Sequence, residues 1–260
     1  MTFENRLKFF ILHVQKIGFF TTVSYFVQRL LKRKSELIEL HLEGLSHSVY
    51  LRNKTYDTNI FYQIFIQEDL FLNNEEDISM IIDCGANIGL ATLYFQRAFH
   101  HAKIIAIEPE NENYNLLLKN TENYSNVSAL RLGVFDKDCD LSVIDIGEGE
   151  ASYRLMHKAA KGKVIQTIVC RSIDSLMEEL SIDKIDILKM DIEGSEKECL
   201  LAPKMEWLEK TKYLLMEIHE NIHPGLTQQV YNKIGSLGTS FVTSKAGEYT
   251  VIKNTSADFL

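Results

Sequence analysis

The sequence predicts an α/β fold built on a mainly parallel sheet with helices on both faces. Short apolar strands alternate with helices from residue 79 onward. A length of 260 residues suits one large α/β domain with an extension, or two small domains, and the composition, 45% hydrophobic and 25% charged, is that of a globular protein. The composition excludes disordered and fibrous classes. The net charge of −8 argues against a nucleic-acid partner, which needs a basic face.

Residues 1–36 are predicted to form a basic helical segment, with one or two amphipathic helices broken near Gly18. Residues 1–34 carry seven Lys and Arg against Glu4, a balance of +6, which leaves −14 for the rest of the chain. Two interpretations stay open. The helices either cap the main domain with their charges in solvent, or contact an anionic membrane surface peripherally.

Residues 37–76 are predicted to be a lead-in to the main domain. Apolar and polar residues alternate at 38–42 and 49–52 with Gly44 between them, which is a β-hairpin pattern. A short helix is expected at Asn59–Phe65, followed by an acidic turn at 73–77. We place the main boundary at this turn.

Residues 77–260 are predicted to form the main domain. Core strands are expected at Ser79–Asp83, Ala102–Ile107, Val127–Leu132, Ile185–Met190 and Tyr213–Ile218. Helices are expected from Gly89 to about Phe99 and at Asn111–Asn120, Ile173–Leu180 and Glu196–Leu201. A strand pair is expected at Leu141–Asp145 and Val164–Cys170, and a closing hairpin at Phe241–Thr243 and Tyr249–Ile252. Ligands of such sheets bind beyond the carboxyl ends of the strands.

The cysteines and the chain start indicate the compartment. Cys84, Cys139, Cys170 and Cys199 form no C-x-x-C pair and are predicted to be free thiols in a reducing compartment. No signal-peptide cleavage site is visible, and no window reaches the ~18 uninterrupted apolar residues of a membrane span. We expect a cytoplasmic protein, peripheral at the inner membrane face if residues 1–34 contact lipid.

The first site motif, Asp83-Cys84-Gly85-Ala86-Asn87-Ile88-Gly89, closes the first core strand. Gly85 and Gly89 allow a tight turn and the close approach of a ligand. The dinucleotide fingerprint would need a glycine where Asn87 stands, which disfavours a pyrophosphate ligand. Asp83 can instead hold a cationic group such as an amino-acid ammonium, or cap the following helix.

The second motif is Glu108, which ends the second strand just before Pro109. A carboxylate at this point can accept hydrogen bonds from both hydroxyls of a ribose. Alone it could equally be a solvated carboxylate before a turn. With Asp83 one strand away, the two acids describe a site for a nucleoside that bears an amino acid and no phosphates.

This combination resembles the S-adenosylmethionine site of class I methyltransferases. The resemblance is closest at residues 189–196, whose Lys-x-Asp-x-Glu-Gly-x-Glu pattern is characteristic of the FkbM-type methyltransferase family. Residues 82–89, 107–109, 172–176 and 216–219 are also similar to that family. The similarity covers about residues 37–255 and leaves residues 1–36 outside.

The resemblance implies the Rossmann-like class I methyltransferase fold with a seven-stranded, mostly parallel sheet. It implies methyl transfer from S-adenosylmethionine to a hydroxyl, often of a sugar, glycolipid, polysaccharide or polyketide. The acidic residue that many relatives place after the third strand is absent, so Val134 would contribute only its backbone near the adenine. The expected cofactor-binding residues are Asp83, Gly85, Ala86, Asn87, Gly89, Glu108, Val134 and Asp191.

Three residues are candidates for orienting or deprotonating the acceptor hydroxyl: Asp191 first, then Glu193, then His219. Each could instead have a structural role. Asp191 could cap the next helix, Glu193 could pair with a lysine, and His219 could hydrogen-bond to a loop carbonyl. With Glu217 they could form an oxygen-rich metal site, but their spacing does not demand one and we expect none. The polar loop Gly147–Tyr153 is interpreted as a mobile lid over the acceptor.

Two other functions stay open. A catalytically silent scaffold that only binds S-adenosylmethionine is disfavoured because the candidate acids are intact. A nicotinamide-dependent oxidoreductase is disfavoured because the middle glycine of the fingerprint is missing. The Asn/Asp-Pro-Pro-Tyr signature of base methylation is absent, so a nucleic-acid acceptor is not expected.

Overall fold

The protein is described from a computed structural model. The structure describes residues 3–70, 77–145, 153–156, 163–237, 241–256 and 259. Residues 147–152, which make up most of the predicted lid, lie outside the described residues.

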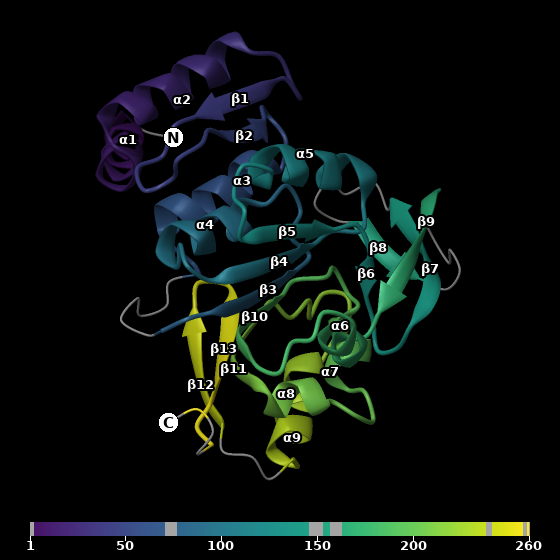
Figure 1. The fold of residues 1–260 in the computed structure, drawn as a ribbon. Coiled ribbons are helices and arrows are strands. Elements are labelled where there is room, and N and C mark those ends of the chain that lie inside the picture. Colours follow the sequence, from purple (N-terminus) through teal and green to yellow (C-terminus); the bar gives the residue numbers. More distant parts are fainter. Residues whose placement is uncertain are drawn as a thin grey trace.

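A seven-stranded sheet forms the centre of the main domain (Figure 1). In spatial order its strands are β12 (Phe241–Ala246), β13 (Tyr249–Asn254), β11 (Thr211–Met216), β10 (Ile185–Met190), β3 (Met80–Cys84), β4 (Lys103–Ile107) and β5 (Val127–Leu130). The pairs from β11 to β5 are parallel, whereas β13 pairs antiparallel with β11 and with β12. The predicted α/β class and the closing hairpin are confirmed.

Helices cover both faces of this sheet, because neighbouring residues of a strand point to opposite faces. Ile81 packs in one hydrophobic cluster and Ile82 in the other. The helices α4 (Leu90–Ala98) and α5 (Asn111–Thr121) lie on one side in Figure 1. The other side holds α6 (Ile173–Glu179), α7 (Glu196–Leu200), α8 (Glu206–Glu209) and α9 (Leu226–Gly235). Helices α8 and α9 were not predicted from the sequence.

A second sheet follows β5. Its strands, in the order β6 (Gly133–Val134), β9 (Lys163–Arg171), β7 (Cys139–Asp145) and β8 (Tyr153–Met156), lie at one end of the molecule (Figure 1). The predicted strand pair corresponds to β7 and β9, which are antiparallel. The short strand β6 pairs parallel with β9, with Val134 opposite Arg171.

The N-terminal segment begins with two helices, α1 (Phe3–Ile17) and α2 (Phe19–Leu31), separated at Gly18 as predicted. The antiparallel strands β1 (Leu37–Leu40) and β2 (Val49–Arg52) follow. The expected short helix is present as α3 (Asp57–Phe61), which continues into a turn of π-helix, η1 (Tyr62–Gln67). None of the described helices is long and apolar enough to cross a membrane.

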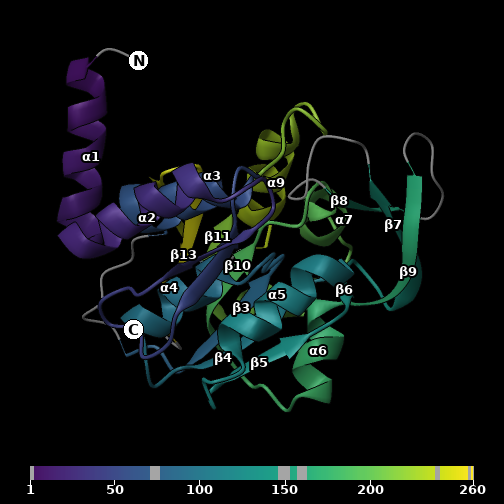
Figure 2. The ribbon, with the colours of Figure 1, turned by 90° about the horizontal axis from the view of Figure 1, so that it is seen from above.

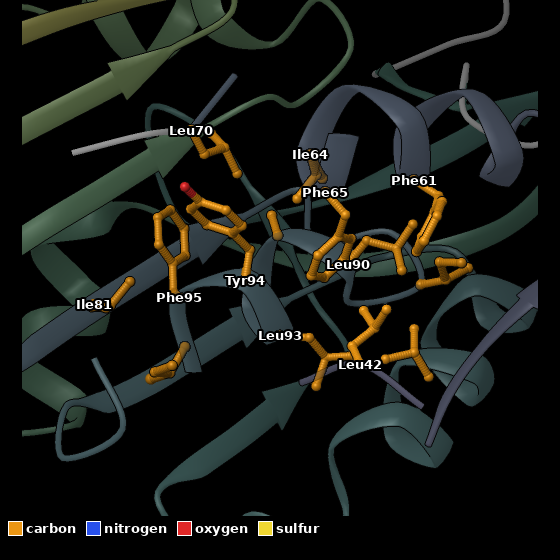
Figure 3. Packing of buried hydrophobic residues seen from close by; sticks show 14 of the residues in the cluster. Leu42, Phe61, Ile64, Phe65, Leu70, Ile81, Leu90, Leu93, Tyr94 and Phe95 are labelled. Carbon is orange, nitrogen blue, oxygen red and sulfur yellow. The ribbon is translucent and has the colours of Figure 1, made fainter. Parts of the chain in front are cut away.

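The lead-in shares its hydrophobic core with the main domain. Figure 3 shows Phe61 and Phe65 packed with Leu90, Tyr94 and neighbouring side chains of that cluster. On the polar side, the Asn120 carboxamide donates to the Tyr50 carbonyl and accepts from the Tyr50 N–H. The first contacts pack α3 and η1 against α4, and the Asn120 bonds join β2 to α5.

Candidate active site

A cavity of about 470 Å³ lies beyond the carboxyl ends of β3, β4, β10 and β11. The predicted site residues Gly85, Ala86, Asn87, Glu108, Val134, Asp191, Glu193 and His219 all line it. Glu217, which the sequence suggested only as a possible metal ligand, also lines it. Residues that were not predicted complete the wall, including Tyr56, Gln63, Asp69, Asn221, Glu248 and Tyr249. The structure therefore brings most of the candidates together around one space.

The turn after β3 is packed tightly against the loop after β10. Gly85 has a φ of +77°, and a Cβ on it would lie 1.7 Å from the Asp191 carbonyl oxygen. Gly89 also has a positive φ, +88°, and a Cβ there would lie 2.8 Å from the Leu117 side chain. Gly89 starts α4 and is not part of the cavity wall. Both glycines are therefore required by the shape of the turn.

Glu108 faces the cavity with a carboxylate that is only partly occupied. One oxygen accepts the N–H of Asn87 at 2.9 Å and the other accepts the N–H of Glu110 at 2.9 Å, and the Asn113 side chain also hydrogen-bonds to the carboxylate. Burial raises the pKa of Glu108 to about 7. Each carboxylate oxygen can accept more than one hydrogen bond, so Glu108 keeps acceptor capacity toward the cavity.

Asp83 does not line the cavity, in contrast to the predicted direct contact with a cofactor ammonium. It is fully buried, with one carboxylate oxygen 3.1 Å from Lys189 Nζ and the other accepting the Thr92 hydroxyl at 2.7 Å. The parallel register sets Lys189 opposite Asp83, and Lys189 Nζ also donates to the Gly85 carbonyl at 3.0 Å. Asp83 thus supports the glycine turn from behind, through a buried ion pair.

The side of the cavity opposite Glu108 holds a cluster of three carboxylates around one imidazole. His219 Nε2 lies 3.6 Å from Glu193, 3.8 Å from Glu217 and 4.0 Å from Asp191. Asp191 Oδ2 accepts the Tyr249 hydroxyl at 3.3 Å and lies 3.7 Å from Lys189 Nζ, which leaves Oδ1 facing His219. This arrangement can orient a hydroxyl and receive its proton.

Glu196, which the sequence analysis placed in the motif without a role, fixes the position of His219. Its fully buried carboxylate accepts the N–H groups of Ile192 at 3.0 Å and Gly194 at 2.7 Å. It also lies 2.9 Å from His219 Nδ1. Because Glu196 acts here as an acceptor, His219 Nδ1 is the donor and Nε2 is directed to the cavity. Asp191, Glu196 and His219 bring possible metal-ligand atoms within 4.8 Å of one another.

Burial and mutual interactions raise the pKa values of three groups in this cluster. Burial, reinforced by Asp191, raises the pKa of Glu193 to about 8 and that of Glu217 to about 7. Burial lowers the pKa of His219, but the Glu196 hydrogen bond and the surrounding carboxylates outweigh it and raise that pKa to about 9. Such groups, close to neutrality, are suited to proton transfer.

The remaining wall comes from both ends of the chain. Tyr56 and Gln63 belong to the lead-in, and Glu248 and Tyr249 to the closing hairpin. The Gln63 amide donates to the Glu248 carboxylate at 2.8 Å, which joins the two segments across the sequence. Sequence reasoning missed these residues because no local motif connects them.

The cavity wall has more acidic than basic groups. Six carboxylates line it, from Asp69, Glu108, Asp191, Glu193, Glu217 and Glu248. His219 is the ionisable base among the lining residues, and no lysine or arginine lines the cavity in the part of the chain that the structure describes. The site therefore suits a ligand with positive charge and no phosphates.

A comparison with protein families identifies the chain. The family model for the methyltransferase FkbM domain matches residues 83–241. The chain belongs to the FkbM methyltransferase family. The match begins at Asp83 and includes the pattern at 189–196 that carried the predicted resemblance.

The individual relatives are distant. Methyltransferase sdnD of Sordaria araneosa is 27% identical over 204 residues, which cover 66% of this chain and 79% of that protein. The hexuronic acid methyltransferase AglP of Haloferax volcanii is 27% identical over 157 residues, 60% of this chain and 62% of AglP.

Solved structures confirm the class I methyltransferase fold. The crystal structure of methyltransferase FkbM from Methylobacillus flagellatus aligns with a TM-score of 0.50 and 17% identity. The alignment covers 74% of this chain and 47% of that structure. This chain thus spans less than two thirds of AglP and less than half of the solved FkbM protein.

Proposed function

We propose that this protein transfers a methyl group from S-adenosylmethionine to a hydroxyl of a sugar, glycolipid or polysaccharide-related acceptor. The observation that carries the proposal is the cavity wall, with six carboxylates and no lysine or arginine among its described residues. S-adenosylmethionine is a cationic nucleoside without phosphates. A nicotinamide dinucleotide brings two phosphates, which normally require N–H donors or basic side chains.

The residues fit the methyl donor along the cavity. Glu108 would accept the two ribose hydroxyls, with Val134 beside the adenine and the turn at Gly85–Asn87 beside the amino-acid end. When bound, the cofactor supplies a methyl group already activated on its sulfonium. The protein then has to place the acceptor oxygen in line with that methyl, and such orientation can supply up to ~7–11 kcal/mol.

His219 is the group that we propose as the base. Glu196 holds Nδ1, so that Nε2 can take the proton of an acceptor hydroxyl that Asp191 Oδ1 orients. At neutral pH the free site keeps His219 protonated, because its pKa is raised to about 9. A sulfonium in the cavity would lower that pKa by like-charge repulsion, and a positioned base contributes ~10²–10⁴-fold.

The acidic wall also bears on the acceptor. Glu217 and Glu248 would repel a carboxylate-bearing sugar such as the hexuronic acid in the name of AglP, whereas Glu193, with its pKa raised to about 8, is mostly protonated at neutral pH. A neutral sugar hydroxyl is the acceptor that agrees with this wall. A lipid-linked form would meet the cavity at a membrane surface, which agrees with the contact predicted for residues 1–34.

The first test is ligand binding. S-adenosylhomocysteine should raise the midpoint of thermal unfolding and NAD should not, since a ligand at ~100 times its dissociation constant adds about 2.7 kcal/mol. Glu108→Gln should reduce this shift by about half or more, because it should weaken the ligand about 10- to 100-fold, whereas Glu112→Gln, an exposed acid on the following helix, should keep it. A shift with NAD alone would contradict the proposal.

The second test identifies the acceptor. The protein is incubated with labelled methyl donor and cell-envelope or lipid-linked oligosaccharide extracts, and the products are analysed by mass spectrometry. The expected product is a sugar that has gained one methyl on oxygen. Cofactor binding without any methylated product would favour a silent binding protein.

A further inference from the structure

The two N-terminal helices expose an unusual share of the apolar surface. Figures 1 and 2 place α1 and α2 together at one end of the molecule, and Figure 2 shows α1 standing out from it. Nine of the fifteen large hydrophobic side chains that are exposed in the described part of the chain belong to them. They are Phe3, Leu7 and Ile11 on α1, and Phe19, Phe20, Val23, Val27, Leu30 and Leu31 on α2.

On α2 these side chains form one continuous stripe. Successive residues of a helix are about 100° apart, so the six exposed side chains fall within an arc of about 120°. Phe20 is 87% exposed, Leu30 80% and Leu31 76%. Thr22 and Tyr25, on the opposite side, are buried against the domain. The helix therefore packs on one side and presents apolar residues to solvent on the other.

The same N-terminal segment carries positive charge. Arg6, Lys8, Arg33 and Lys34 are exposed, and residues 1–34 have a balance of +6 in a chain of net charge −8. Large exposed apolar patches mark interaction sites. The partner of this one has to accept apolar side chains and carry negative charge at its surface.

We infer that α1 and α2 dock in the interface of an anionic lipid bilayer, with the α2 stripe inserted among the lipids. An amphipathic helix lying in the membrane plane buries its apolar face while basic residues contact the headgroups. The remaining chain, with a balance of −14, is repelled by the same surface, so the N-terminal end faces the bilayer. A second copy of this chain is a less suitable partner for this surface, because its N-terminal segment would place a charge of +6 against the same charge.

This inference goes beyond the proposed function and does not rest on methyl transfer. The test is flotation of the full-length protein with vesicles of phosphatidylglycerol and phosphatidylcholine, and with vesicles of phosphatidylcholine alone. The wild type should float with the anionic vesicles and much less with the neutral ones. The variant Phe20→Ser/Leu30→Ser/Leu31→Ser should lose more than about tenfold in partitioning, since three large apolar side chains no longer leave water.

A matched control removes three exposed apolar side chains elsewhere. Val164→Ser/Val169→Ser/Val242→Ser changes residues of β9 and β12 and should float like the wild type. The α2 variant changes exposed residues, and circular dichroism and the unfolding midpoint verify that it is folded. Equal flotation of both variants would overturn the inference. The inference would also be overturned if the wild type did not bind anionic vesicles but formed dimers, measured by light scattering, that were absent in the α2 variant. Loss of methyl transfer in an activity assay would leave the flotation result unchanged.

Discussion

The buried pair of Asp83 and Lys189 gives a prediction that needs no substrate. Their side chains are 0% and 3% exposed and 3.1 Å apart, and Asp83 has one other described partner, the Thr92 hydroxyl. In Lys189→Met the Asp83 carboxylate would remain buried without its counter-charge. We expect this single change to destabilise the fold far more than loss of an exposed lysine.

The expected loss of stability in Lys189→Met follows from the burial of the ion pair. Removing one partner of a buried ion pair costs ~3–5 kcal/mol, whereas replacing both partners by uncharged groups of similar volume is often neutral. In a domain of this size ~1 kcal/mol shifts the unfolding midpoint by about 2–4 °C, so Lys189→Met should lower it by about 6–20 °C. The double variant Asp83→Asn/Lys189→Met should recover most of that loss.

The assay is thermal and denaturant unfolding of the single and double variants, followed by circular dichroism. Lys197→Met, at an exposed position on α7, is the matched control and should stay close to the wild type. A loss below about 1 kcal/mol in Lys189→Met, the value of an exposed pair, would refute the reasoning. A double variant less stable than the single one would refute it as well.

Four further outcomes are expected. Gly85→Ala should lower the unfolding midpoint and abolish S-adenosylhomocysteine binding by calorimetry, because its Cβ would lie 1.7 Å from the Asp191 carbonyl. The pH profile of kcat/KM should rise to about pH 9, since His219, with its pKa raised to about 9, must lose its proton to act as base. Glu196→Gln should move that rise about 1–3 units lower, because the pKa of His219 loses the support of the Glu196 hydrogen bond and charge. Glu108→Gln should weaken S-adenosylhomocysteine about 10- to 100-fold in the same calorimetric assay, the value of ~1.5–3 kcal/mol of charged hydrogen bonds.

Much of the fold was predictable because buried parallel strands appear in the sequence as short apolar runs. The site was partly predictable because ligands of such sheets bind beyond the carboxyl ends of these strands. This logic found Glu108 and Asp191, which face one cavity. It failed for Asp83, because a carboxylate at a strand end can turn to the cavity or to a neighbouring strand, and only the register reveals Lys189 opposite. The role of Glu196 depends on a loop folding back on its own backbone, which spacing does not show.

The missed helix α9 is a different case. Leu226, Val230 and Ile234 are spaced four residues apart and are all buried, so a helical pattern was present in the sequence. Tyr56 and Glu248 could not have been found in this way. They lie almost 200 residues apart and meet only because the lead-in and the closing hairpin reach the same end of the sheet.

The wall built from Tyr56, Gln63, Glu248 and Tyr249 lies entirely outside residues 83–241, the region that matches the FkbM family. Under the proposed function, this part of the wall can therefore vary between family members while the donor turn at Gly85–Asn87 stays the same. Grafting both flanking stretches from another family member should retarget the enzyme while its affinity for the donor is retained. Exchanging one stretch alone would break the Gln63–Glu248 bond and leave a mismatched chimera.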